Sequence, residues 1–253
     1  MSQPGYLEPV EQPKRPRLVL RAPAEDLPLL SVLALLLAGV SIGRSRLVGL
    51  AETSDLVATA QALEAMGVMI DRSASGWVVA GAGSGALLEP LQALDFENAP
   101  RAFALFAGLA SSYDFPVTCR LGAAPDPDLL APLAAMGAQV EAPDARPQSL
   151  PCQAVLHGPR SANPISWIGQ GVSDDIAAAV LLAGLNTQGR TSVVAPRELE
   201  RLVELFRSFG AEIELRQTGS GPAQIAVTGR RRLMAAEIVF DGSEAADIAA
   251  GQR

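Results

Sequence analysis

Hydrophobic positions along the chain follow patterns that predict both helices and strands. The run from Leu27 to Gly43 carries no charged side chain, so it predicts a helix without a polar face. The stretch from Asp55 to Met66 places its apolar residues on one stripe at helical spacing, which predicts an amphipathic helix. Short β-rich runs, such as Val68 to Ile70 and Trp77 to Ala80, predict strands. Together these patterns indicate an α/β fold.

The same order of elements recurs along the chain, and two series of glycines mark it. One series follows the amphipathic helices, at Gly67, Gly137 and Gly210. The other lies where an apolar helix ends in an Ala-Gly pair, at Gly39, Gly108 and Gly184. We expect the glycines of the second series to adopt the left-handed conformation that closes helices. Both series recur about every 70 residues, which predicts a repeated β/α unit.

The apolar first helix of each unit has no polar face, so it must be covered on all sides. Three units meet this need if these helices pack inside and the sheets outside, in one compact domain. We expect this domain over residues 18–236, with repeats at about 22–90, 91–160 and 161–232. Residues 1–17 are rich in proline and charge, which predicts a flexible tail.

The net negative charge of the chain excludes some classes of binding partner. The chain has 253 residues and a formal net charge of -7. Nucleic acids and anionic membranes require clustered cations, so neither partner is expected. The one basic cluster, Arg230 to Arg232, is more typical of a solvated turn than of a binding patch.

The sequence indicates no membrane segment and no disulfide framework. The run from Leu27 to Gly43 is slightly short for a span, contains Pro28, and follows acidic residues rather than a basic flank. Cys119 and Cys152 form no CxxC motif, so a reducing compartment is expected. We therefore predict a cytoplasmic protein.

Two adjacent carboxylates, Asp174 and Asp175, stand at the start of an uncharged apolar stretch. They suit a catalytic pair, and they also suit a helix start in which Ser173 is the N-cap and both acids lie in the first turn. We favour the helix start. The single histidine, His157, has no partner at a ligand spacing, so neither a metal nor a cofactor is expected.

Several segments resemble the first half of the 3-phosphoshikimate 1-carboxyvinyltransferase (EPSP synthase) family, among them LVGLAETSDLVATAQALEAMGVMI, LDFENAPRAFALFAGLASSYDF and VLLAGLNTQGRTSVVAP. The resemblance runs from about Leu18 to Ala249. It implies three βαβαββ repeats that form half of an inside-out α/β barrel. It also implies transfer of an enolpyruvyl group from phosphoenolpyruvate to shikimate 3-phosphate, in a cleft between two domains. By the same likeness, residues 237–253 are expected to be the stub of a second domain that this chain lacks.

The resemblance implies five candidate substrate-binding residues. Ser173 matches the phosphate-binding serine of the family, and Asp175 stands where the family has glutamine. Asn98 and Arg101 lie in the segment similar to the family's Gly-Asn-Ala-Gly-Thr turn, and Arg201 lies in the segment that replaces the family's Ser-Arg-Asp-His-Thr-Glu. No catalytic residue is assigned.

Most cations that the family uses to hold its anionic substrates are replaced in this chain. The segment from Pro23 to Leu33 has no basic residue where the family has lysine and arginine. Ala177 replaces another lysine, and the shortened turn at Gly122 carries Asp126 and Asp128 instead of an arginine. A cation about 4 Å from a phosphate contributes on the order of 4 kcal/mol near a protein surface. We therefore expect little affinity for such substrates.

These observations lead to one main hypothesis and two alternatives. The main hypothesis is a catalytically inactive relative that serves as a binding, scaffold or regulatory module, as a homodimer or with a full-length or C-terminal-half synthase. One alternative is a subunit of a split synthase, or a transferase with a less anionic substrate. The other is a decayed fragment. The segments Leu18–Arg21 and Glu237–Phe240 either pair together or recruit another chain, and such exposed edges predict self-association.

Overall fold

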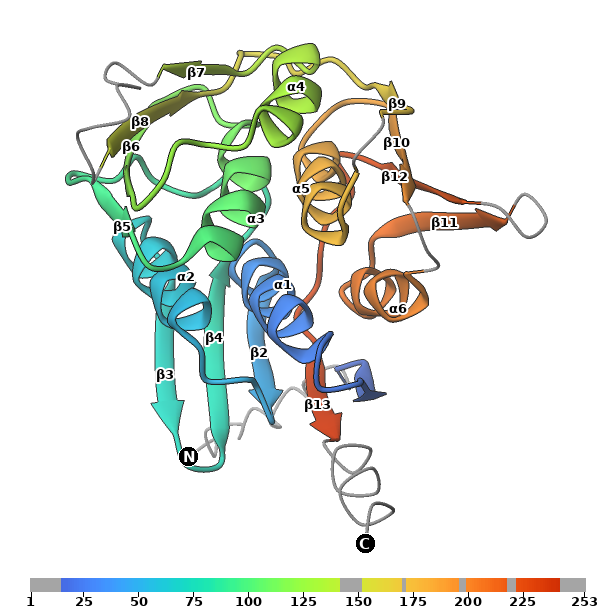
Figure 1. The fold of residues 1–253 in the computed structure, drawn as a ribbon. Helices are drawn as coiled ribbons and strands as arrows, with labels where there is room; N and C mark the ends of the chain where they lie inside the picture. The colour runs from blue at the N-terminus through green and yellow to red at the C-terminus, as the bar shows by residue number, and fades with distance from the viewer. Residues whose placement is uncertain (1–14, 142–151, 170–171, 196–198, 218–221, 242–253) are drawn as a thin grey trace, which may run out of the picture.

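The computed structural model describes residues 15–141, 152–169, 172–195, 199–217 and 222–241, and its elements follow the order βαβαββ three times (Figure 1). The first unit contains β1 (Arg17–Arg21), α1 (Leu27–Gly39), β2 (Ile42–Val48), α2 (Ser54–Ala65), β3 (Met69–Ser73) and β4 (Gly76–Ala82). The second contains β5 (Leu94–Phe96), α3 (Pro100–Ala110), β6 (Pro116–Leu121), α4 (Pro127–Ala135), β7 (Gln139–Glu141) and β8 (Cys152–His157). The third contains β9 (Ser166–Trp167), α5 (Asp174–Leu185), β10 (Arg190–Ala195), α6 (Glu200–Ser208), β11 (Glu212–Gln217) and β12 (Ala223–Thr228), and β13 (Glu237–Asp241) follows it.

Each unit contributes one mixed sheet. The second and third units form four-stranded sheets in the orders β5-β6-β8-β7 and β9-β10-β12-β11. The first unit forms a five-stranded sheet in the order β1-β13-β2-β4-β3, because β13 inserts between β1 and β2 and runs parallel to both.

The insertion of β13 answers the question that the sequence left open about the two end segments. They pair with each other in register, from Arg17 opposite Glu237 to Arg21 opposite Asp241. Residues 237–241 are therefore part of the first unit's sheet, and the predicted boundary after Ala236 falls too early. The pairing covers one edge of β1, while its other edge is the outer edge of the five-stranded sheet, so self-association stays a prediction.

The first helices of the three units, α1, α3 and α5, form the centre of the molecule, with the sheets around them (Figure 1). Every residue of α1 from Leu29 to Gly39 is buried, because α2, α3, α6 and β4 all pack against it. This surrounding explains why the helix has no polar face. The predicted fold class, with apolar helices inside and sheets outside, is confirmed. Within the described residues, no helix is both long and apolar enough to cross a bilayer.

The glycines that follow the amphipathic helices adopt the left-handed conformation that was expected of the other glycine series. Gly67, Gly137 and Gly210 come directly after the last turns of α2, α4 and α6, and all three have positive φ angles, of 92°, 101° and 83°. Glycine reaches this left-handed region without the clash that a Cβ atom causes. The three turns therefore share one local cause.

The glycines of the inner helices serve a different purpose from the one expected. Gly39, Gly108 and Gly184 lie inside α1, α3 and α5, and none of them has a positive φ. Instead, a Cβ atom at each would collide with a neighbouring element. At Gly108 it would meet the backbone of Ala179 in α5, and at Gly184 it would lie 2.6 Å from Cγ1 of Val227. These glycines allow close packing, and they do not close the helices.

We expect Gly108→Ala to destabilise the protein by at least about 2 kcal/mol, because the added methyl group forces α3 and α5 apart. In an ordinary helix interior the same change would stabilise by about 0.5 to 1 kcal/mol. The matched control is Gly210→Ala, where the space is open and only the positive φ opposes the change, at a cost of about 1 kcal/mol. Urea denaturation of both variants measures the difference. A Gly108→Ala protein as stable as wild type would contradict the packing argument.

Candidate functional site

A cavity of about 670 Å³ lies where α2, α3 and α5 begin and where β6 leads into α4. Among the residues that line it, Arg101 carries the positive charge, and four carboxylates surround the same space: Asp55, Glu97, Asp126 and Asp175. The starts of buried helices attract anions, because their first N–H groups have no partner within the helix. If side chains of the protein already accept hydrogen bonds from these N–H groups, the cavity has fewer donors to offer to an anionic ligand.

The start of α5 is capped by its own sequence. The hydroxyl oxygen of Ser173 accepts a hydrogen bond from the backbone N–H of Ile176 at 3.2 Å, and Asp174 and Asp175 occupy the first turn. The helix-start interpretation of this segment is confirmed. The hydroxyl oxygen that the resemblance assigned to phosphate is already engaged with the helix, and two negative charges already interact with its dipole.

Arg101, at the start of α3, forms an ion pair with Asp175 of α5. The distance between Arg101 Nε and Asp175 Oδ1 is 2.9 Å, and the two side chains are 33% and 28% exposed. Burial raises the pKa of the Asp175 carboxyl above its usual range; Arg101 opposes this rise, and the charges of Asp174 and Asp55 add to it. The surroundings of Asp175 therefore disfavour negative charge even though they contain a guanidinium.

An N–H group at the start of α3 donates its hydrogen bond to a side chain of another helix, α2. Pro100 opens α3 and has no N–H to donate, and the backbone N–H of Ala102 donates to Oδ1 of Asp55 at 2.9 Å. Asp55 belongs to the first turn of α2, where Thr53 already provides the N-cap. In sequence, Asp55 is indistinguishable from an ordinary first-turn acid, so its contact with α3 was missed.

The remaining two carboxylates come from the turns before α3 and α4. Asp126 is the N-cap of α4 and accepts a hydrogen bond from the N–H of Asp128 at 2.9 Å. The turn of Glu97 packs directly on the turn of Gly122, where a Cβ atom would collide with the carbonyl oxygen of Glu97. This close approach brings both acidic turns to the same cavity.

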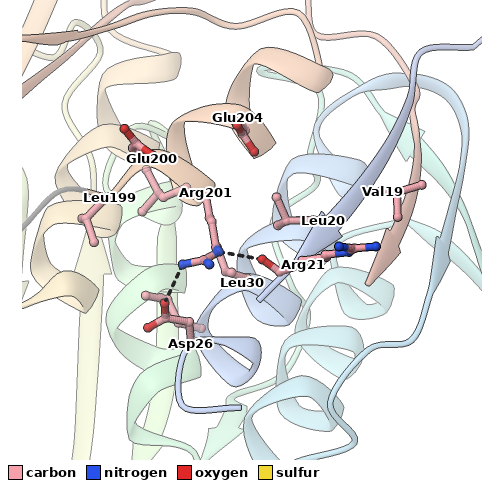
Figure 2. Close-up of a pocket in the computed structure, with 11 residues that line it drawn as sticks. Val19, Leu20, Arg21, Asp26, Leu30, Leu199, Glu200, Arg201 and Glu204 are labelled. Atoms are coloured by element: carbon pink, nitrogen blue, oxygen red, sulfur yellow. Dashed lines mark hydrogen bonds and ion pairs between the residues drawn. The ribbon is translucent and has the colours of Figure 1, made fainter. Parts of the chain in front are cut away.

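The other two candidates from sequence lie away from this cavity. Asn98 is exposed just before α3 and does not line it. Arg201, in α6, lines a second cavity of about 640 Å³ next to β1 and α1 (Figure 2). There its Nε donates to the carbonyl oxygen of Arg21 at 2.6 Å, and its Nη1 lies 3.9 Å from Oδ2 of Asp26. The structure thus brings Ser173, Asp175 and Arg101 together and separates them from Arg201.

The site has the electrostatics of an acidic pocket whose cation is already paired. Within the described ranges, no group of three His, Cys, Asp or Glu side chains is arranged to hold a metal ion. Three of the four carboxylates have other partners: Asp55 accepts from α3, Asp126 caps α4, and Asp175 pairs with Arg101. The arrangement favours neutral or cationic groups over a phosphate.

Comparison with known proteins relates the chain to one family. The family profile described as EPSP synthase (3-phosphoshikimate 1-carboxyvinyltransferase) matches residues 28–251. The 3-phosphoshikimate 1-carboxyvinyltransferase of Pseudomonas sp. (strain PG2982) is 36% identical over 209 residues, which cover 81% of this chain and 46% of that protein. The protein of the same name from Brucella canis is 35% identical over the same length.

The fold is shared with solved structures as well. EPSP synthase from Acinetobacter baumannii superposes with a TM-score of 0.75 and 23% identity, over 89% of this chain and 49% of that one. A second structure of the enzyme from this organism gives a TM-score of 0.74. The chain spans about half the length of the curated relatives that it matches. Because the family profile covers most of its residues, the chain belongs to the EPSP synthase family.

Proposed function

We propose that this chain is an EPSP synthase-like binding, scaffold or regulatory module, which does not transfer an enolpyruvyl group on its own. One observation carries the proposal: Arg101, the cation that lines the cavity at the helix starts, is paired with Asp175 at 2.9 Å. The relatives are named for a phosphorylated shikimate. A ligand of that kind would meet Arg101 beside the carboxylate of Asp175, which neutralises the guanidinium and already accepts from its Nε.

The balance of charges argues in the same direction. Near a protein surface, a cation about 4 Å from a phosphate contributes on the order of 4 kcal/mol, and a carboxylate at that distance costs a similar amount. Four carboxylates and one guanidinium line this cavity. Asp55 also accepts the hydrogen bond of the Ala102 N–H, a donor that α3 would otherwise offer to an anion.

The partner of such a module would be a second copy of the chain, a full-length synthase or a C-terminal half. Support for a synthase partner comes from the retained half-barrel architecture, with its three sheets around a common set of helices. A second candidate function is a transferase, or half of one, with a less anionic substrate, and the acidic lining of the cavity favours it. Assay of enolpyruvyl transfer after mixing the chain with a C-terminal half distinguishes the two functions.

The first test is a calorimetric titration with shikimate 3-phosphate. We expect no saturable binding below about 1 mM at the cavity of Arg101, because Asp175 holds its guanidinium. The matched variant Asp175→Asn frees Arg101 and removes one negative charge, so we expect it to bind this ligand at least about 10-fold more tightly. Micromolar binding to the wild-type chain that disappears in Arg101→Gln would overturn the proposal.

The second test uses the pKa of Asp175. Since this pKa lies above its usual value of 3.8, the folded state binds the proton more tightly than the unfolded state does. The resulting stabilisation is complete below pH 3.8 and is lost as pH rises through the raised pKa. We therefore expect the wild-type free energy of unfolding to fall relative to that of Asp175→Asn between about pH 3.5 and 7.

Urea denaturation at fixed ionic strength measures this pH dependence. Asp174→Asn is a second informative variant, because it removes a charge that raises the pKa of Asp175, and we expect it to make the fall in stability with rising pH smaller. A wild-type chain that becomes more stable than Asp175→Asn as pH rises would mean that Arg101 outweighs burial. The cavity would then accept negative charge, contrary to the proposal.

A further inference from the structure

A third cavity, of about 420 Å³, lies at the opposite end of α5 from Ser173. Its walls come from the start of β2, the segment after β4, Asn186 at the C-cap of α5, and the arginines Arg230 to Arg232 after β12. We call this space the arginine cavity. It joins the first and third units, and it is separate from the acidic cavity at the helix starts.

The arginine cavity is strongly positive on an acidic protein. Three guanidinium groups line it, and no acidic side chain is among its lining residues. Arg231 pairs with Glu212 across 2.6 Å, whereas Arg230 and Arg232 make no ion pair or side-chain hydrogen bond in the part of the chain that the structure describes. All three side chains are exposed. The chain as a whole carries a net charge of -7, so this local excess of positive charge runs against its composition.

The backbone holds Arg230 in an unusual conformation. Its φ is 57°, and it is the one non-glycine residue with a positive φ among the described residues. The backbone N–H of Arg230 donates to the carbonyl oxygen of Leu185 at 2.7 Å, and the N–H of Gly229 donates to that of Gly189 at 2.9 Å. A glycine would adopt this φ with less strain. An arginine in its place supplies one of the guanidinium groups that line the cavity.

The residues of the first unit that line the arginine cavity are mostly small or apolar. Ile42 is 46% exposed there, and Ala82 and Ala86 lie beside it, with the hydroxyl of Ser84 between them in sequence. A cavity of this size accommodates a small organic molecule. The ligand that fits such walls has an apolar part against Ile42 and an anionic group against the arginines.

We propose that the arginine cavity binds a small organic phosphate. Guanidinium groups match phosphate oxygens through paired N–H donors, and Arg230 and Arg232 have donors to spare. An extended nucleic acid fits less well, because its further phosphates would face the acidic remainder of the chain. The basic cluster alone is typical of a solvated turn; the cavity, the positive φ of Arg230 and the unpaired guanidinium groups of Arg230 and Arg232 favour a site.

The arginines also lie near the negative end of the α5 dipole, which they stabilise. If this were their only role, replacing the arginines would lower the stability of the protein and would not affect the binding of any ligand. The experiment must therefore measure binding, with variants that keep the fold. Arg230→Gly suits this purpose because glycine tolerates the positive φ, and Arg232→Gln keeps a polar side chain of similar length.

The test titrates the full chain with phenyl phosphate at low ionic strength, by calorimetry. We expect saturable binding to the wild-type chain, tighter than that of inorganic phosphate because the ring contacts Ile42. We expect Arg230→Gly/Arg232→Gln to lose at least about 10-fold in affinity, in line with the loss of hydrogen bonds to a charged group. The matched control is Arg160→Ala, which removes one exposed guanidinium that does not line the cavity and should leave binding unchanged.

Three outcomes overturn the proposal. The first is the absence of saturable phenyl phosphate binding to a wild-type chain that unfolds cooperatively. The second is equal binding by the double variant and by Arg160→Ala. Tighter binding of a single-stranded oligonucleotide than of phenyl phosphate would also reject the small-ligand proposal in favour of a nucleic acid.

This inference is independent of the proposed function. Binding of shikimate 3-phosphate that disappears in Arg230→Gly/Arg232→Gln belongs to the arginine cavity and leaves the acidic cavity without a ligand. Binding that disappears in Arg101→Gln contradicts the proposed function and leaves the arginine cavity untouched. The two sets of variants thus separate the failure of one proposal from the failure of the other.

Discussion

The burial of three helices that carry no charge beyond their first turns is the constraint on which this structure depends. Such helices expose no face that water can solvate, so every side of α1, α3 and α5 must be covered. Three sheets and three amphipathic helices supply the cover (Figure 1). The centre then has to be packed closely, and glycines at Gly108 and Gly184 let neighbouring backbones and side chains approach where any Cβ would collide.

The same constraint creates the electrostatics of the candidate site. The starts of α2, α3 and α5 meet at one cavity, and unpaired N–H groups and aligned dipoles make that region attractive to negative charge. In this chain the negative charge is internal. Ser173 caps α5, and two acids occupy the first turn of that helix. Asp55 accepts a hydrogen bond from α3, and Asp175 forms an ion pair with Arg101. The fold of the helices and sheets is thus shared with the family, while the helix starts at this cavity are satisfied by side chains of the chain itself.

Much of this could be predicted from the sequence because it follows from local pattern. The period of about 70 residues gave the three units, and the turn glycines after the amphipathic helices are visible in the chain. The N-cap at Ser173 was also predictable, because caps are local. The role of Gly108 was not, since a helix-ending glycine and a close-packed one are alike in sequence. Only the position of α5 distinguishes them.

The sequence by itself determined the alternation of apolar and amphipathic helices, the uncharged core and the excess of acidic over basic residues. These are properties of residue type and spacing. The tertiary structure alone decided which distant groups meet: Asp55 with Ala102, Arg101 with Asp175, Arg201 with Asp26, and β1 with β13. Each of these contacts joins different elements, and their relative placement depends on how the whole core packs. No spacing along the chain encodes it.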